Sequence, residues 1–141
     1  MHLSRDPLAI NAVVNDPAVR PFVGAPDAGP IDVAPLVDCD LNLFPFGEHG
    51  GFALLWSAPG AREVHTFILP TGRGQWARDA AQEMIAMAGE SGTAMLWTRI
   101  PADQPHVRSY AMRAGMKPTG ETLDTFGKPY AVYSMECGSC H

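Results

Sequence analysis

A four-residue loop, Thr71 to Gly74, joins an apolar strand pattern directly to a helical pattern that starts at Gln75. The first N–H groups of a helix have no acceptor inside the helix, and the helix dipole adds positive potential at the same end. A glycine beside that end lets a ligand approach the backbone closely. The residue types and their spacing therefore predict a binding site for the phosphates of a ligand.

The strand before this loop carries two side chains that can take up a proton, Glu63 and His65. Alternation along the strand places both on one face, together with Phe67 and Leu69. Histidine changes its charge near neutral pH, so His65 is a candidate general base, and Glu63 is a second candidate. Each also has a purely structural interpretation: a histidine hydrogen-bonded beneath a helix, and a surface carboxylate at a strand end.

The C-terminal residues Cys137, Cys140 and His141 form a Cys-x-x-Cys-His pattern. That pattern is typical of c-type haem attachment, and the same side chains would supply three of the four ligands of a zinc site, with Cys39 as a fourth. The chain shows no export signal, and no segment follows the histidine to cover a haem. We therefore expect a reduced tail that holds no metal.

Hydrophobic periodicity and turn residues divide the chain into short elements. Helical patterns cover residues 8–14, 18–22, 75–88 and 105–114, and strand patterns cover residues 31–36, 41–46, 51–57, 62–69, 93–100, 117–123 and 130–135. The helix after the loop carries rows of small and apolar residues at four-residue spacing, so it can lie close to a sheet. These elements predict an α/β (α+β) fold in which helices flank a mixed sheet. We expect one domain over residues 1–141, with residues 136–141 as a flexible tail.

The composition narrows the range of partners. The chain has 46% apolar and 18% charged residues, as is usual for soluble domains, and a net charge of −5. That charge argues against non-specific binding of nucleic acid and favours cationic partners such as amines. No apolar run is long enough to span a membrane, and three cysteines do not suggest a disulfide framework, so we expect a cytoplasmic protein.

Three stretches of the sequence resemble the GNAT superfamily of acyl-coenzyme A-dependent N-acyltransferases. Residues 69–74 are similar to the family's strand end and phosphate loop, and residues 100–107 and 113–116 are similar to its later strand, helix and glycine ending. The resemblance covers residues 51–135 and implies a GNAT-like, mostly antiparallel central sheet. Short sequences within residues 15–21, 64–74 and 98–101 also resemble a subgroup of small phage-encoded GNAT-like proteins.

The resemblance implies where acetyl-coenzyme A would bind as the co-substrate. In the family, N–H groups of the loop hold the pyrophosphate, and the main chain of the preceding strand holds the pantetheine arm. Carried onto this chain, the loop residues are Arg73, Gly74, Gln75, Trp76 and Ala77, with Arg78 as a further phosphate contact. The strand residues are Phe67, Ile68 and Leu69.

Two departures from the family pattern leave a second function open. Trp76 and Arg78 stand where the family has small residues, and the tyrosine that serves the family as general acid is shifted by one position, to Tyr110. A shift of one residue turns a helical side chain by about 100°. The first hypothesis is therefore an N-acyltransferase that moves an acetyl or other acyl group to an amine, with His65, Glu63 and Tyr110 as catalytic candidates.

The alternative is a non-catalytic GNAT-like module, such as a phage or prophage assembly protein or a virion component. Candidate partners are a small-molecule or protein amine, a second copy of the chain as a homodimer, and virion proteins if the protein is phage-encoded. The protein would be located in the cytoplasm, or in a virion if it is phage-encoded. Neither nucleic acid nor a membrane is expected as a partner.

Overall fold

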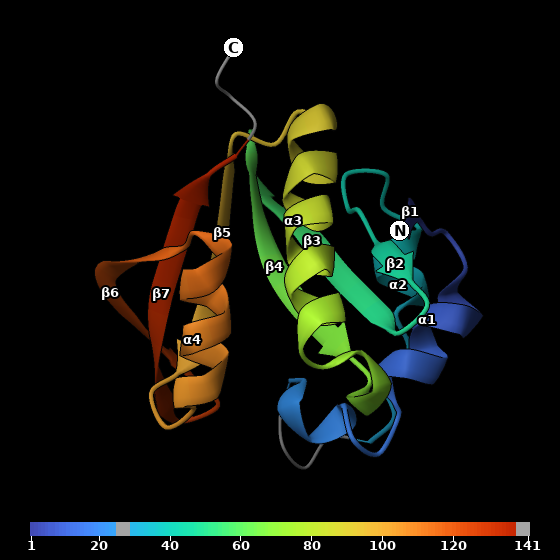
Figure 1. Cartoon of the computed structure of the whole chain (residues 1–141), viewed down its shortest axis with the longest axis horizontal. Coiled ribbons are helices and arrows are strands. Elements are labelled where there is room, and N and C mark those ends of the chain that lie inside the picture. The colour runs from blue at the N-terminus through green and yellow to red at the C-terminus, as the bar shows by residue number, and fades with distance from the viewer. Residues whose placement is uncertain (25–28, 138–141) are drawn as a thin grey trace.

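The computed structural model describes residues 1–24 and 29–137, which form a seven-stranded sheet with helices packed against both of its faces (Figure 1). The strands are β1 His2–Leu3, β2 Pro45–Gly47, β3 Gly50–Ala58, β4 Ala61–Ile68, β5 Met95–Pro101, β6 Lys117–Thr125 and β7 Lys128–Glu136. The helices are α1 Pro7–Val14, α2 Ala34–Val37, α3 Gln75–Glu90 and α4 Pro105–Ala114, with the short 3-10 turns η1 Arg20–Phe22 and η2 Pro70–Gly72.

The strands follow the spatial order β1-β2-β3-β4-β5-β7-β6. Every neighbouring pair is antiparallel except β4 and β5, which are parallel. This confirms the predicted mixed, mostly antiparallel sheet. The hairpin of β3 and β4 was also predicted correctly. Its tight turn at Pro59 and Gly60 needs a positive φ, 76°, which glycine adopts without strain.

Helices α3 and α4 lie side by side on one face of the sheet (Figure 1). Helix α3 presents the alanine-rich stripe that its sequence predicts, with Ala77, Ala80, Ala81, Met84 and Ala88 buried. Small side chains allow this helix to lie close to the strands. Helix α4 ends at Gly115, which has the left-handed φ of 111° expected of a glycine at that position.

Two hydrophobic clusters lie on opposite faces of the sheet. One joins α3 and α4 to the strands through side chains that include Val64, Met84 and Leu96. The other joins α1 and α2 to the opposite face and includes Ile10 and Phe67. Val64 and Phe67 therefore point to opposite faces of β4, as the alternation of the sequence predicts.

The prediction of an edge strand over residues 31–36 is wrong. Residues Ala34–Val37 form helix α2 instead, with Pro35 in its first turn. The carboxylate of Asp32 accepts a hydrogen bond from the N–H of Ala34 at 3.0 Å, and this bond favours a helix start over a strand. The strand predicted over residues 41–46 is shorter than expected, since regular pairing begins only at Pro45 and Leu43 forms an isolated bridge with Leu54.

Residues 136 and 137, which were predicted to belong to a flexible tail, are instead bound to the sheet. Glu136 is the last residue of β7, and Cys137 is 1% exposed with its N–H bonded to the carbonyl of Ala94 at 2.9 Å. The Cys137 thiol also contacts the carbonyl of Ile85. Residues 138–141, including Cys140 and His141, lie outside the described residues.

Two consecutive glycines, Gly50 and Gly51, hold β3 close to both of its neighbours. A Cβ atom on Gly50 would lie 2.1 Å from the carbonyl oxygen of Phe67 on β4, and one on Gly51 would lie 2.3 Å from the carbonyl oxygen of Pro45 on β2. Neither distance is compatible with a side chain. The main chain can approach this closely only because both positions lack a Cβ.

Candidate active site

The parallel strands β4 and β5 separate part of the way along their length. Their ladder runs through three pairs, Ala61 with Met95, Arg62 with Leu96, and Glu63 with Trp97. One residue further on, the hydroxyl of Thr98 donates to the carbonyl of Val64 at 3.0 Å, so a side chain replaces the main-chain ladder. The remainder of β4 has no strand partner on that side among the described residues.

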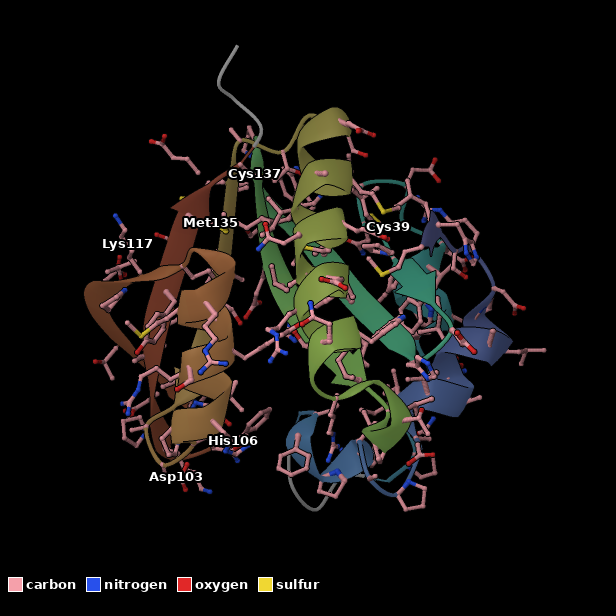
Figure 2. All side chains as sticks on the ribbon, viewed as in Figure 1. Cys39, Asp103, His106, Lys117, Met135 and Cys137 are labelled. Atoms are coloured by element: carbon pink, nitrogen blue, oxygen red, sulfur yellow. The ribbon has the colours of Figure 1, made fainter. Side chains whose placement is uncertain are left out.

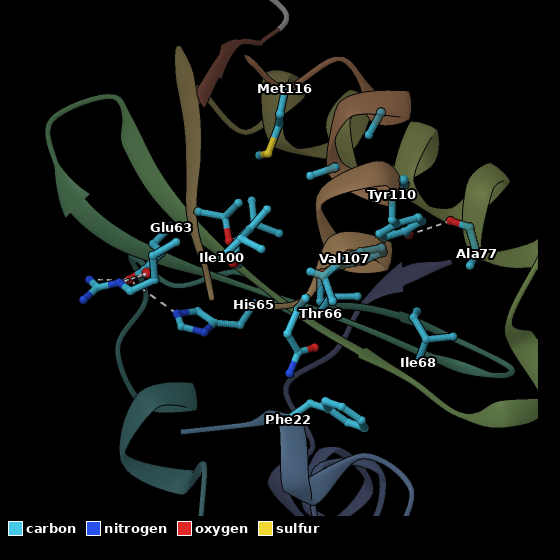
Figure 3. Close-up of a pocket in the computed structure, with 18 of the residues that line it drawn as sticks. Phe22, Glu63, His65, Thr66, Ile68, Ala77, Ile100, Val107, Tyr110 and Met116 are labelled. Carbon is cyan, nitrogen blue, oxygen red and sulfur yellow. Dashed lines mark hydrogen bonds and ion pairs between the residues drawn. The ribbon is translucent and has the colours of Figure 1, made fainter. Parts of the chain in front are cut away.

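A cavity of about 690 Å³ passes through this gap. On the α3 and α4 face it is lined by Thr66, Ile68, Ala77 and Tyr110, and on the other face by residues that include His65 (Figure 3). A cavity of this size matches the range that small-molecule sites occupy. The gap therefore connects the two faces of the sheet, so that ligands bound on opposite faces would meet between the strands.

The main chain of β4 alternates its direction across this gap. The carbonyl of Val64 faces β5, because it accepts from Thr98, and the N–H of Leu69 faces the other way and donates to the carbonyl of His49 at 2.9 Å. Both groups of one residue point to the same side and successive residues alternate, so the main-chain groups of Thr66 and Ile68 face the gap.

This geometry separates the three strand residues proposed to bind the pantetheine arm. Ile68 lines the cavity and its main chain faces the gap. Phe67 and Leu69 turn their main chain toward β3 and pack their side chains in the cluster with α1. Thr66, which the resemblance did not indicate, takes the place beside Ile68. Strand alternation could have identified Thr66 and Ile68 from the sequence, once the direction of one main-chain group in β4 was known.

The loop before α3 leaves several N–H groups without an acceptor in the part of the chain that the structure describes. These groups belong to Gly74, Gln75, Trp76 and Ala77, and no side chain caps the helix. Gly74 has φ 105°, and a Cβ there would meet no atom within 4 Å. Both Gly74 and Ala77 border the cavity. The loop thus offers N–H groups without acceptors and open space beside them, which are the features that an anion site requires.

The two residues that depart from the family pattern do not obstruct this loop. Trp76 turns toward the β2–β3 turn, where its indole lies edge-on to the ring of His49, with ring centres 5.2 Å apart. Arg78 is exposed and donates to the side chain of Gln75 at 3.0 Å. Neither residue lines the cavity, and the same holds for Gln75.

Arg73 is engaged in holding the loop together. Its N–H donates to the carbonyl of Pro70 at 3.3 Å, and its guanidinium donates to the carbonyl of Ala18 at 3.1 Å. The side chain still borders the cavity. Arg73 therefore ties the segment before η1 to the start of α3, and its positive charge lies beside the free N–H groups.

Glu63, His65 and Arg99 form a charged group on the face of the sheet opposite α3. Glu63 accepts from the Nε of Arg99 at 2.8 Å, and its other oxygen lies 3.4 Å from Nε2 of His65 (Figure 3). Nε2 is buried, and the described residues offer it no well-aligned hydrogen bond. Arg99 also donates to the hydroxyl of Thr125 at 3.3 Å. The structure thus brings the two predicted proton-transfer residues together at the point where the strands separate.

Burial alone would raise the pKa of Glu63, whose side chain is 12% exposed. The contacts with His65 and Arg99 outweigh burial and hold this pKa below its usual value. Glu63 is therefore ionised at neutral pH. In that state it lies beside His65 and balances the charge of Arg99, and it is a poor proton acceptor itself.

Tyr110 lies on the α4 side of the cavity. Its hydroxyl donates to the carbonyl of Ala77, in the first turn of α3, at 2.7 Å (Figure 3). Burial raises the pKa of this hydroxyl above its usual value, so it keeps its proton through the neutral range. In the described state Tyr110 connects α4 to the turn of α3 that carries the free N–H groups.

Several lining residues were not predicted from the sequence. Gln104, the residue before α4, lines the cavity. Its neighbour Asp103, labelled in Figure 2, is exposed and does not line it. Phe22 and Phe126 also line the cavity, although they are far apart in the sequence. Their only signal in the sequence was an aromatic residue beside a turn. An analysis of hydrophobic periodicity does not distinguish such a residue from any other loop position.

The described residues do not test the metal interpretation of the cysteines, because Cys140 and His141 lie outside them. Cys39 is exposed and lies on the opposite side of α3 from the buried Cys137 (Figure 2). Within residues 1–24 and 29–137, no group of three or more histidine, cysteine or acidic side chains is arranged to hold a metal ion. In the same residues, no helix combines the length and the apolar character that crossing a bilayer requires.

No protein-family model matches the chain, and no curated protein does either. Several solved structures do match the chain. A chimera of the Vibrio cholerae spermidine N-acetyltransferase and hSSAT superimposes with a TM-score of 0.75 at 13% identity, over 96% of this chain and 93% of that chain. The Vibrio cholerae spermidine N-acetyltransferase in complex with CoA and spermine gives a TM-score of 0.74 at 11% identity, over 94% and 90% of the two chains.

An aminoglycoside acetyltransferase in complex with coenzyme A and kanamycin gives a TM-score of 0.73 at 12% identity, over 96% of this chain and 92% of that chain. At such low identity the comparison establishes architecture, and the activity of each neighbour belongs to that neighbour alone. The chain accordingly has the fold of the GNAT acetyltransferases.

Proposed function

We propose that this protein is an acyl-coenzyme A-dependent N-acyltransferase. The observation that carries the proposal is the single cavity that joins three features: the free N–H groups before α3, the unpaired main chain of β4, and the pair of Glu63 and His65. The first feature fits a diphosphate, the second an amide-containing arm, and the third an amine that must lose a proton. The coenzyme complexes of the neighbouring folds support this choice of co-substrate.

The donor would lie on the face covered by α3 and α4. Gly74 to Ala77 would donate N–H groups to its pyrophosphate, with the guanidinium of Arg73 adding positive charge nearby. Thr66 and Ile68 would pair with the pantetheine arm as a short strand would. The donor supplies an activated acyl thioester, whose carbonyl would then lie in the gap beyond Glu63 and Trp97.

The amine would approach from the opposite face, where His65 lies. Its nitrogen attacks the thioester carbonyl, so that a C–N bond forms and the C–S bond breaks, and the proton of the amine passes to His65 directly or through water. Glu63 stabilises the imidazolium that results. The N–H groups of β4 that face the gap are placed to stabilise negative charge on the carbonyl oxygen.

Tyr110 is the remaining candidate for the leaving thiolate. It keeps its proton at neutral pH, as an acid must, and its hydroxyl lies in the wall of the donor side. Its hydrogen bond to Ala77 would have to be exchanged for one to sulfur. We propose that its first role is to position α4 against the start of α3, and that any transfer of its proton depends on the donor being bound.

The test is a titration of the full chain with acetyl-coenzyme A, followed by calorimetry and by thermal unfolding. A ligand that binds only the folded state raises the melting temperature by mass action. Binding, together with release of free thiol when amines are added, would support the transferase. Absence of binding at millimolar acetyl-coenzyme A would overturn it and leave the non-catalytic GNAT-like module as the better hypothesis.

A further inference from the structure

We propose that the amine acceptor is a monoamine with an aryl body and no second positive charge. The inference rests on the proposed function and narrows the class of amine that the same cavity takes. It differs from what the names of the neighbouring structures indicate for those proteins, since spermine and kanamycin carry several amino groups. Two observations carry it: the charges that line the cavity and the aromatic side chains at its acceptor end.

The lining of the cavity holds little negative charge. Of the described lining residues, Glu63 alone is acidic, while Arg73 and Arg99 are both basic. Glu63 is not free to serve a ligand, because Arg99 contacts one of its oxygens at 2.8 Å and His65 the other at 3.4 Å. The described wall thus carries a surplus of positive charge even before a histidine is protonated.

A ligand with several ammonium groups would be poorly held here. Each ammonium that leaves water needs a counter-charge or a full set of hydrogen bonds, and burying it without them is unfavourable. The cavity offers no free carboxylate for a second ammonium among the described residues. Arg99 balances the charge of Glu63, so this pair offers little net stabilisation to a protonated amino group beside it, and only the neutral amine attacks a thioester.

The acceptor end of the cavity is rich in exposed aromatic surface. Phe22 and Phe126 are 60% and 56% exposed, and both line the cavity together with Tyr130. Phe22 lies in η1 and Phe126 in the hairpin between β6 and β7, so two distant parts of the chain supply them. Single exposed apolar residues are common, but several around one cavity indicate a surface that an apolar ligand covers.

The position of Phe126 places an aromatic ring near the charged group. Its neighbour Thr125 accepts a hydrogen bond from Arg99, which in turn contacts Glu63. Phe22, from η1, lines the same cavity as His65 (Figure 3). An aryl group bound against either ring would share the cavity with His65.

The backbone of Phe126 supports a role for its side chain. Its φ is 52°, the one positive value among the described non-glycine residues. Turns of this shape favour asparagine, aspartate or glycine, and a bulky residue there costs stability. The turn therefore gives no reason for a phenylalanine, whereas a ligand-binding role does.

The first experiment compares acceptors with acetyl-coenzyme A and the full chain. The amines are 2-phenylethylamine, ethylamine, spermidine and kanamycin, and thiol release and the mass of the product are measured for each. We expect kcat/KM for 2-phenylethylamine to exceed that of every other amine by about tenfold or more, as burial of an apolar group in a fitted pocket provides. Binding of the same amines by calorimetry in the presence of CoA gives a second readout that does not require turnover.

The second experiment uses the variants Phe126→Ala and Phe22→Ala, with Leu8→Ala as a control. Leu8 is 79% exposed and does not line the cavity. We expect each phenylalanine variant to lower kcat/KM and affinity for 2-phenylethylamine by about tenfold while ethylamine and acetyl-coenzyme A are unaffected. Leu8→Ala should leave all of these values unchanged.

The outcomes separate the two proposals. A protein that binds acetyl-coenzyme A but prefers spermidine or kanamycin retains the proposed function and overturns this inference. Equal losses for ethylamine and 2-phenylethylamine in the phenylalanine variants also overturn it, because they would reflect a structural effect. A protein that does not bind acetyl-coenzyme A overturns the proposed function and, with it, the acceptor assignment.

Discussion

The hydroxyl of Thr98 donates to the carbonyl of Val64 at 3.0 Å, one residue beyond the last ladder pair of β4 and β5. A side chain thus closes the ladder at the point where the strands separate. Without this bond the carbonyl of Val64 would face the cavity without its partner on β5. The bond sets where the gap begins, and with it the distance between Glu63 and the first free main-chain group of β4.

Replacement of Thr98 by valine should lower both stability and turnover. Loss of the hydrogen bond should reduce the free energy of unfolding by about 1 kcal/mol, since valine has nearly the same volume. Thr98→Ser keeps the hydroxyl and should restore turnover. Urea unfolding and steady-state kinetics measure the two effects. Equal activity of the valine and serine variants would show that the bond does not control the gap.

His65→Ala should reduce kcat by about 100-fold or more if the imidazole is the general base. Affinity for acetyl-coenzyme A should not change, because His65 lies on the face opposite the one where we propose that the donor binds. A variant that keeps full activity, or that loses affinity for acetyl-coenzyme A instead, would rule out this role.

Gly74→Ala should weaken the binding of acetyl-coenzyme A. Gly74 has φ 105° beside the free N–H groups, and alanine would shift that backbone. Gly92→Ala is a matched control at the other end of α3, since Gly92 also has a positive φ, 86°, and open space around its Cα. Both variants should lose similar stability, but only Gly74→Ala should lose affinity, by about tenfold. Equal affinities would place the diphosphate elsewhere.

Tyr110→Phe distinguishes an acid from a positioning residue. Loss of the bond to the carbonyl of Ala77 should cost about 1 kcal/mol of stability and raise KM for acetyl-coenzyme A severalfold, with kcat little changed. An acid required for thiolate departure would instead show a fall in kcat of about 100-fold or more with KM unchanged. Steady-state kinetics at saturating amine separates the two results.

The stability of the protein should fall in acid partly through Glu63. Its pKa is lower in the folded chain than its ordinary value of 4.5, so the folded state binds fewer protons there. The stabilisation from the carboxylate is therefore complete above pH 4.5 and is lost as the pH falls through the folded pKa. Glu63→Gln should flatten this part of a urea-stability profile from pH 7 to pH 3.

Glu121→Gln is the control for that experiment, because Glu121 is an exposed residue of β6. Its profile should follow that of the wild type. A Glu63→Gln profile as steep as the wild-type one would show that the contacts with Arg99 and His65 do not stabilise the folded state.

The sequence predicted the second half of the fold best. Residues 62–69, 75–88 and 105–114 carry complete periodic patterns with glycine at the turns, and the structure matches them to within a few residues. The N-terminal half was less predictable because its elements are short and rich in proline. Next to Pro35 the decisive feature was a local hydrogen bond from the N–H of Ala34 to the carboxylate of Asp32, which apolar alternation does not reveal.

The candidate site divides in the same way. Strand alternation correctly placed Glu63 and His65 on one face, because it depends only on local geometry. The bond from Arg99 to Glu63 spans 36 positions in the sequence and depends on a parallel pairing that no local pattern specifies. The contribution of Phe126 likewise depends on how the β6–β7 hairpin folds over the gap.

The glycines at positions 50 and 51 lie outside the cavity, yet a methyl group at either one would press against the main chain of a neighbouring strand. In a library of random substitutions, these two codons should tolerate replacement less than most residues that face the ligand. A scan of activity alone would then mark them as important for the wrong reason. Measuring the abundance of each variant alongside its activity would separate loss of folding from loss of ligand binding. A side chain forced between the strands prevents folding and so lowers the amount of protein.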